Sequence, residues 1–227
     1  MKYKLILFDA DGTLFNFDKA EWEAFEKTMR KFGIRENLNT LHSEYEKINK
    51  AVWKEFEEKK ISSAKLRVER FRRFFENQKL DLNPKEISPA YLVNLAQGID
   101  LLEGAEEIVS YFHGKCELAL ATNGLAEVQR PRFANSRLAK YFQHIFISEE
   151  IGFPKPNREF FEYIFAELPY KYSAIIVGDN LTSDIQGGVD FGIDSCWYNP
   201  KNLKNETSIK PTYEIHELAE LKNIIKF

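Results

Sequence analysis

Short apolar runs recur along the chain and end in polar or glycine-containing turns. Near-continuous apolar runs are typical of parallel strands that are buried on both faces of a sheet. We predict such strands at residues 3–8, 117–121, 145–147, 174–177 and 195–198. Apolar residues at helical spacing lie between and after them, at 105–112, 158–168, 183–191 and 217–225. This alternation predicts an α/β fold with a doubly wound, open parallel sheet, whose ligands bind beyond the carboxyl ends of the strands.

The segment from Lys19 to about Gln97 breaks this alternation, because it contains no convincing strand. Apolar and aromatic residues recur there at helical spacing and predict a bundle of four helices, at about 19–32, 41–59, 63–78 and 84–96. The segment is too long for an ordinary connection, which usually takes about 2–6 residues outside its helix. We therefore predict an inserted helical domain over 17–97 and an α/β core domain formed by 1–16 and 98–227.

Composition limits the possible partners. Apolar residues make up 44% of the chain, enough for a sizeable core, and the charged residues nearly cancel to a net charge of −3. No basic excess therefore favours binding to nucleic acid or to an anionic membrane surface. No segment approaches the ~20 apolar residues of a membrane span, and the N-terminus lacks a signal-peptide pattern. We expect a soluble cytoplasmic protein, a monomer or homodimer, with a small molecule as partner.

Acidic residues follow two of the predicted strands. Asp9 and Asp11 come directly after the first strand, and Gly12 permits the sharp turn that such a strand exit needs. Asp179 follows a later strand, and Asp184 lies where a helix should begin. Taken separately, these residues are equally well explained as solvated turns or as first-turn acids of a helix.

The acidic residues gain a different meaning if the two strand ends adjoin, because three or four carboxylates then converge. Two unit charges ~4 Å apart repel by about 4 kcal/mol at an effective dielectric constant near 20. A divalent cation attracts each carboxylate about twice as strongly and outweighs that repulsion. Oxygen ligands on loops suit Mg²⁺, which also binds substrate phosphates.

Two further segments offer groups for a phosphate. The Thr122 hydroxyl and the backbone amides of Asn123 and Gly124 follow the strand at 117–121, although an N-cap would explain them equally well. Lys155 lies between two prolines and could offset negative charge there, although a lysine in a loop is usually only solvated. We interpret the four scattered histidines as surface or capping residues rather than as zinc ligands; they are His42, His113, His144 and His216.

The order of these segments resembles the four motifs of the haloacid dehalogenase (HAD) superfamily of phosphohydrolases. DADGT, TNG, KPN and GDNLTSD match the motifs in turn, and the helical insertion resembles the four-helix cap of the family. The resemblance covers nearly the whole chain and implies a HAD-like Rossmannoid core. It also implies that Asp9 attacks phosphorus to form an aspartyl phosphate. Asp11 would protonate the leaving oxygen and later deprotonate the hydrolytic water. Dehalogenase and phosphonatase members lack an acid at the position of Asp11.

The same resemblance implies a ligand set. Mg²⁺ would be held by Asp9, the backbone carbonyl of Asp11 and Asp179, with Asp184 as a further or water-mediated ligand. Thr122, Asn123 and Lys155 would bind the phosphoryl group. These residues lie in the matched motifs.

Several longer segments resemble one branch of the superfamily, the YjjG-type pyrimidine 5′-nucleotidases. They are FDADGTLFNFD, INKAVWKEFEEKKISS, TNGLAEVQ, FISEEIGFPKPN and GDNLTSDIQGG. The resemblance implies hydrolysis of uridine, deoxyuridine or deoxythymidine monophosphates. The stretch PRFANS departs from the pattern, where a sequence closer to RL-x-x-x-GL is expected, and this puts the helix there in doubt.

Selection of the leaving group should depend on the helical insertion, because the core motifs contact only phosphate. Phe17, Asn49 and Trp53 are candidates for the substrate pocket, and packing within the insertion is the alternative for each. Hinges near 16–18 and 97–100 would let the cap open and close. Two other functions remain open. One is a capped phosphatase or phosphomutase for sugar phosphates or phosphoglycolate, and the other is a non-catalytic binding module.

Overall fold

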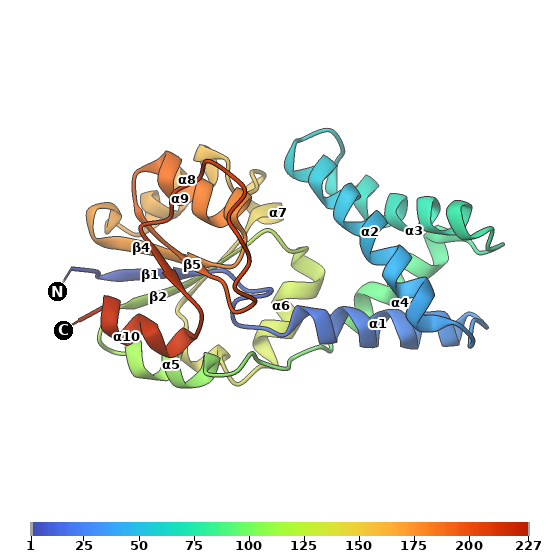
Figure 1. Ribbon diagram of the computed structural model, residues 1–227, viewed down its shortest axis with the longest axis horizontal. Coiled ribbons are helices and arrows are strands. Elements are labelled where there is room, and N and C mark those ends of the chain that lie inside the picture. The colour runs from blue at the N-terminus through green and yellow to red at the C-terminus, as the bar shows by residue number, and fades with distance from the viewer. Residues whose placement is uncertain (1, 227) are drawn as a thin grey trace.

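The computed structural model describes residues 2–226 and contains a six-stranded, wholly parallel sheet (Figure 1). The strand order is β3-β2-β1-β4-β5-β6, so the first strand of the chain lies in the middle. The strands are β1 Leu5–Phe8, β2 Glu117–Thr122, β3 His144–Ile147, β4 Ala174–Gly178, β5 Asp194–Tyr198 and β6 Tyr213–Ile215. This confirms the predicted open parallel sheet. The edge strand β6 was not predicted, because a three-residue strand with one exposed and one half-buried residue has no long apolar run.

Helices cover both faces of the sheet. They are α5 Ala105–Phe112, α6 Ala126–Ala134, α7 Ser148–Ile151, α8 Arg158–Glu167, α9 Gln186–Phe191 and α10 Leu221–Ile224. Side chains of β1 alternate between two cores: Ile6 and Phe8 join a cluster with α5 and α10, while Leu5 and Leu7 join one with α8 and α9. Burial on both faces explains why the strand is continuously apolar.

Two predicted helices differ in detail from those observed, and one doubtful helix is present. The segment predicted as one helix at 183–191 begins with a π-helical turn, Leu181–Ile185, before α9. The segment at 217–225 contains a 3₁₀ turn, Leu218–Glu220, and the single turn α10. The PRFANS stretch, where the helix was in doubt, is helical to Ala134 with Pro131 inside α6. Burial of Val128 and Phe133 offsets the hydrogen bond that this proline cannot donate.

Four helices form the predicted inserted bundle, called the cap below: α1 Phe17–Lys31, α2 Leu38–Glu57, α3 Ser63–Gln78 and α4 Pro84–Leu95. The cap has a hydrophobic cluster that also includes two residues from the side of the sheet, Val128 of α6 and Leu125 directly before it. Tyr45 lies at the centre of an aromatic core, with ring centroids 5.2 Å from those of Phe25 and Phe71. Among residues 2–226, no helix combines the length and the apolar character that a membrane span requires.

The chain enters and leaves the cap through two adjacent segments. Asn16 N donates to Asp100 O at 2.9 Å, and Leu102 N donates to Leu14 O at 2.9 Å. The start of β1 and the helix α10 lie at the opposite end of the sheet from the cap (Figure 1). The carboxyl ends of the central strands and the cap therefore face one another.

Candidate active site

A cavity of about 810 Å³ lies between the carboxyl ends of the strands and the cap. We call it the central pocket. Its sheet side contains all of the predicted core residues: Asp9, Asp11, Thr122, Asn123, Lys155, Asp179 and Asp184. Its cap side contains the three predicted substrate residues, Phe17, Asn49 and Trp53. The structure thus brings every predicted catalytic, metal-binding, phosphate-binding and substrate residue to one pocket.

Strand order explains why the acidic residues meet. Phe8 of β1 is in register with Val177 of β4, so the loops that follow the two strands start side by side. Carboxylate oxygens of Asp9, Asp179 and Asp184 all lie within 4.8 Å of one another. We call these three residues the aspartate group. The expected convergence of carboxylates is present, and it comprises three side chains because the Asp11 carboxylate lies elsewhere.

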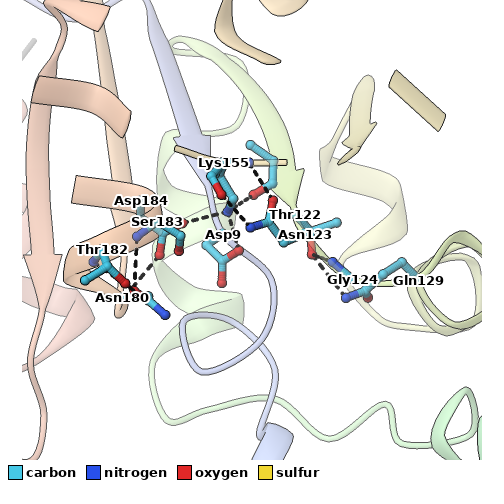
Figure 2. A network of polar contacts seen from close by, with 11 residues as sticks. Asp9, Thr122, Asn123, Gly124, Gln129, Lys155, Asn180, Thr182, Ser183 and Asp184 are labelled. Atoms are coloured by element: carbon cyan, nitrogen blue, oxygen red, sulfur yellow. Dashed lines mark hydrogen bonds and ion pairs between the residues drawn. The ribbon is translucent and has the colours of Figure 1, made fainter. Parts of the chain in front are cut away.

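Lys155 is inserted into the aspartate group (Figure 2). Its ammonium group donates to Asp9 Oδ1 at 2.6 Å, to Asp184 Oδ1 at 2.6 Å and to the Ala121 carbonyl at 2.5 Å. The lysine is 1% exposed, so it is no solvated surface charge. Burial alone would lower the pKa of Lys155, but Asp184 and Asp9 outweigh that effect and raise it. The ammonium group is therefore a permanent positive charge at the floor of the pocket.

The Asn123 side chain holds the backbone of Lys155. Its Oδ1 accepts from Lys155 N at 2.8 Å, and its Nδ2 donates to Lys155 O at 2.9 Å (Figure 2). This two-point contact joins the loop after β2 to the loop before α8. Sequence reasoning considered only the backbone amide of Asn123 and missed this contact, because it spans 32 residues.

Asp9 and Asp179 of the aspartate group carry shifted pKa values. Burial raises the pKa of Asp9 well above its usual range; Lys155 acts against this shift, and Asp184 adds to it. Desolvation and the neighbouring Asp184 raise the pKa of Asp179 to about 7. Asp179 is exposed as a residue, yet its carboxylate packs against Gly12, whose φ of +81° and lack of a Cβ make that approach possible. With all three carboxylates ionised, the aspartate group and the Lys155 ammonium together carry a net charge of −2.

A divalent cation fits the aspartate group, because three oxygen donors within 4.8 Å and an excess of negative charge match the preferences of a hard ion. A second set of potential ligands lies on the cap side, where Glu21, His42 and Glu46 also lie within 4.8 Å of one another. Contrary to expectation, His42 is not a surface residue: its side chain is 12% exposed and packs edge-on against Trp22 and Phe25. Burial lowers the pKa of His42 and favours the neutral ring.

Asp11 points toward α6 instead of toward the aspartate group. Arg132 Nη1 donates to its Oδ1, and Gln129 Nε2 donates to its Oδ2 at 2.6 Å. Gln129 also donates to the Thr122 hydroxyl at 3.2 Å, and Gly124 N donates to the same hydroxyl at 3.0 Å. Sequence reasoning missed Gln129 and Arg132, although both lie within or beside the segments quoted for the resemblance.

The cap side of the pocket contains a buried amide beside a buried acid. Asn49 is 4% exposed and donates from Nδ2 to Glu21 Oε1 at 2.7 Å, while its Oδ1 has no hydrogen-bond partner within residues 2–226. Burial, and secondarily Glu46, raises the pKa of Glu21 to about 7. Phe17 and Trp53 are half-buried and present ring surface to the same pocket.

Residues 3–192 match the family model of haloacid dehalogenase-like hydrolases. Because this match spans most of the chain, the protein belongs to that family, as the motif resemblance predicted. It is thus an enzyme, and the sequence-based alternative of a non-catalytic binding module finds no support in these comparisons.

Full-length relatives refine this picture. Pyrimidine 5′-nucleotidase PynA of Streptococcus pneumoniae is 38% identical and covers 100% of this chain and 98% of its own length. Pyrimidine 5′-nucleotidase YjjG of Escherichia coli is 30% identical, with 99% of each covered. The crystal structure of the HAD-hydrolase YfnB from Bacillus subtilis, bound to magnesium, has a TM-score of 0.93 at 34% identity and covers both chains fully. The resemblance to pyrimidine 5′-nucleotidases is thereby confirmed.

Proposed function

We propose that this enzyme is a Mg²⁺-dependent phosphomonoesterase that hydrolyses pyrimidine nucleoside 5′-monophosphates through an aspartyl phosphate on Asp9. The observation that carries the chemistry is the Lys155 ammonium group between Asp9 and Asp184 at the floor of the central pocket. A fixed cation beside a carboxylate nucleophile reduces the repulsion that a phosphate dianion meets on approach, and a bound Mg²⁺ would offset more of it. Phosphoryl transfer depends mainly on such positioning and charge neutralisation.

The reaction divides into two displacements. An Asp9 oxygen attacks phosphorus, the bond from phosphorus to the ester oxygen breaks, and Asp11 gives its proton to the departing nucleoside. A water oxygen then attacks the phosphorus of the aspartyl phosphate and gives a proton to Asp11. Asp9 leaves as a carboxylate and inorganic phosphate is released. A carboxylate nucleophile thus replaces one difficult hydrolysis by two easier steps.

The remaining motif residues would bind the phosphoryl group and the metal ion. Thr122, Asn123 and Lys155 provide donors at the end of β2 and in the loop before α8. The side chains of Asp9, Asp179 and Asp184 and the Asp11 backbone carbonyl would hold Mg²⁺, which neutralises charge on the phosphate when bound. The magnesium-bound relative YfnB supports this assignment.

We further propose that 17–97 is a mobile cap domain on a core domain formed by 1–16 and 98–227. Movement about 16–18 and 97–100 would admit the substrate and then exclude water. Arg67 of α3 donates to Glu127 at 2.6 Å and lies 2.8 Å from Glu149, so a cation of the cap joins two core acids in this structure. The interdomain movement described for YfnB supports a hinge here.

The pyrimidine would bind on the cap side of the pocket. Phe17 and Trp53 offer apolar ring surface, and the unpartnered Asn49 Oδ1 offers an acceptor for a base N–H group. Aromatic stacking on a base contributes about 1–3 kcal/mol. The activities in the names of PynA and YjjG support the same substrate class. The cytoplasmic location and the monomeric or homodimeric state stay predictions.

A panel of phosphate esters assayed with Mg²⁺ tests the proposal. We expect kcat/KM for uridine, deoxyuridine or deoxythymidine monophosphate to exceed that for glucose 6-phosphate and phosphoglycolate by about tenfold or more, because one well-placed base contact contributes ~1.4 kcal/mol or more. EDTA should reduce turnover to background, and added Mg²⁺ should restore it. Sugar phosphates that are better substrates would overturn the nucleotidase assignment, and full activity in EDTA would overturn the metal assignment.

A further inference from the structure

Asp11 is held by two buried side chains that the family motifs do not include. Arg132 is fully buried and Gln129 is 1% exposed, whereas the Asp11 side chain is 24% exposed and lines the central pocket. Each donor takes one carboxylate oxygen, Arg132 taking Oδ1 and Gln129 taking Oδ2. Both come from one face of α6, at positions three residues apart.

Each donor also contacts a second functional part of the molecule. Gln129 Nε2 reaches the Thr122 hydroxyl at 3.2 Å, as Figure 2 shows, and a side chain at Gly124 would block that path, because a Cβ there would lie 2.2 Å from Nε2. Arg132 Nε donates to the Gly98 carbonyl at 2.6 Å, where the chain returns from the cap. Its guanidinium lies 4.8 Å from the centroid of the Phe15 ring, where the chain leaves for the cap.

Stability alone does not explain a buried arginine at this place. A buried ion pair is often no more stabilising than apolar residues of similar volume, because both charges lose their water. What the pair does provide is a fixed geometry. Two donors on two oxygens fix both the position and the rotation of the Asp11 carboxylate. Through their second contacts, they also fix it relative to the Thr122 hydroxyl and to the two segments that connect the core to the cap.

We propose that Arg132 and Gln129 are positioning residues for the acid–base group Asp11, so that proton transfer to the leaving oxygen depends on α6. The inference rests on the proposed phosphatase function and adds two residues to it. Neither residue lines the central pocket. They act through Asp11, because they hold its carboxylate beside Thr122, at the junction of the sheet and the cap.

The experiment uses the dependence of the reaction on the leaving group. Phenyl phosphate releases a weakly acidic phenol that needs a proton, whereas p-nitrophenyl phosphate releases a stable anion that needs much less help. Neither ester carries a nucleobase, so base recognition does not enter. Single-turnover release of each phenol, with enzyme and Mg²⁺ in excess, is measured for wild type and for Arg132→Met and Gln129→Leu. Arg130→Met is the matched control, because Arg130 lies on the same helix and pairs with Glu150 at the surface.

General acid–base catalysis contributes typically 10²–10⁴-fold. We therefore expect Arg132→Met to slow phenyl phosphate by about 10²-fold and p-nitrophenyl phosphate by only a few-fold. Gln129→Leu should change the ratio of the two rates in the same direction. Its lost contact with Thr122 affects both esters alike and cancels from that ratio. Arg130→Met should leave both rates unchanged.

An unchanged ratio in the variants, including equal slowing of both esters, would overturn the proposal and leave Arg132 with a purely structural role. Circular dichroism and thermal unfolding show whether each variant is folded. If Arg132→Met does not fold, Gln129→Leu decides the question by the same ratio. A wild-type enzyme that releases neither phenol would overturn the phosphatase function itself, which is a different result from an unchanged ratio.

Discussion

The central pocket has a buried acid on each side, and the two acids are balanced in opposite ways. On the sheet side, Asp9 shares a buried ammonium group with Asp184, at 2.6 Å from each. On the cap side, Glu21 has a neutral amide, Asn49, as its hydrogen-bond partner at 2.7 Å, and Glu46 adds like charge. The sheet side therefore holds a fixed positive charge, the Lys155 ammonium group, beside its acids, as the proposed phosphoryl chemistry requires. The cap side holds an acid that can be neutral near pH 7, as recognition of an uncharged base allows.

The strongest test of the fixed-charge side removes the nucleophile. Asp9→Asn keeps the size of the side chain but loses the attacking carboxylate, so we expect turnover to fall on the order of 10⁴-fold or more. Steady-state hydrolysis of uridine monophosphate measures the effect. The fold should persist, and circular dichroism checks this. Substantial turnover by the folded variant would contradict the covalent mechanism, provided that the preparation contains no wild-type enzyme formed by deamidation or mistranslation.

A smaller effect is expected from the recognition side. Asn49→Leu removes the unpartnered Oδ1 and the donor to Glu21, while the aspartate group and Lys155 stay in place. We expect kcat/KM for uridine monophosphate to fall by about 10–50-fold, because losing a base contact and leaving a buried acid unpaired together cost roughly 1.4–2.3 kcal/mol. The rate with p-nitrophenyl phosphate should change by less than about twofold, since that ester makes no base contact.

The matched control for this change is Asn94→Leu. Asn94 is a half-buried cap asparagine that donates to Thr28 at 2.9 Å and lies outside the central pocket. It should alter stability without altering the preference for the nucleotide. An equal loss on both esters in Asn49→Leu would show that Asn49 supports the cap and does not read the base.

The smallest effect concerns stability and pH. The pKa of Glu21 is about 7 in the folded protein and about 4.5 in an unfolded chain. The folded protein therefore keeps a proton that the unfolded chain has already released, and wild-type stability falls as pH rises from 4.5 through 7. Glu21→Gln removes this loss. We expect the variant to match wild type near pH 4.5 and to exceed it at pH 8 by roughly 3 kcal/mol.

Urea unfolding between pH 4.5 and 8 measures this difference. Glu23→Gln is the control on the same helix, because the Glu23 side chain is 41% exposed and pairs only distantly with Lys19, at 3.8 Å. It should show the wild-type pH dependence. A constant offset between Glu21→Gln and wild type across the range would mean that Glu21 is ionised throughout, and that the two sides of the pocket are alike.

Local sequence patterns predicted most of the sheet side of the pocket. Asp9 and Asp179 each follow a buried strand directly, so the parallel order of the strands alone brings them together. Lys155 was expected to offset negative charge, and it does so at full burial. The cap was predicted as a whole, because amphipathic spacing extends over each helix and no strand pattern competes with it.

The contacts that sequence could not predict are those between side chains far apart in the chain. Arg132 and Gln129 reach Asp11 across 121 and 118 residues. The sequence around them contains no pattern that would predict these contacts. His42 was expected at the surface because one histidine has no periodic pattern, yet two aromatic rings enclose it. β6 was not predicted because edge strands need few apolar residues. The π-helical turn at Leu181–Ile185 was not predicted because it depends on the Asn180 side chain, which accepts from Thr182 N and Ser183 N.

The adjacency of the two crossings between sheet and cap has an evolutionary consequence. Because Asn16 and Asp100 are hydrogen-bonded neighbours, the cap is a closed loop inserted at one point of the core, and its ends stay in the same place whatever the loop contains. Closing a flexible loop costs only about 0.6 kcal/mol more for each doubling of its length. An insertion of different length or sequence can therefore replace the cap at this point in evolution without changing the catalytic residues of the core. Arg132 donates to the Gly98 carbonyl at the same junction and also contacts Asp11. A new insertion would have to preserve this contact to keep Asp11 in position.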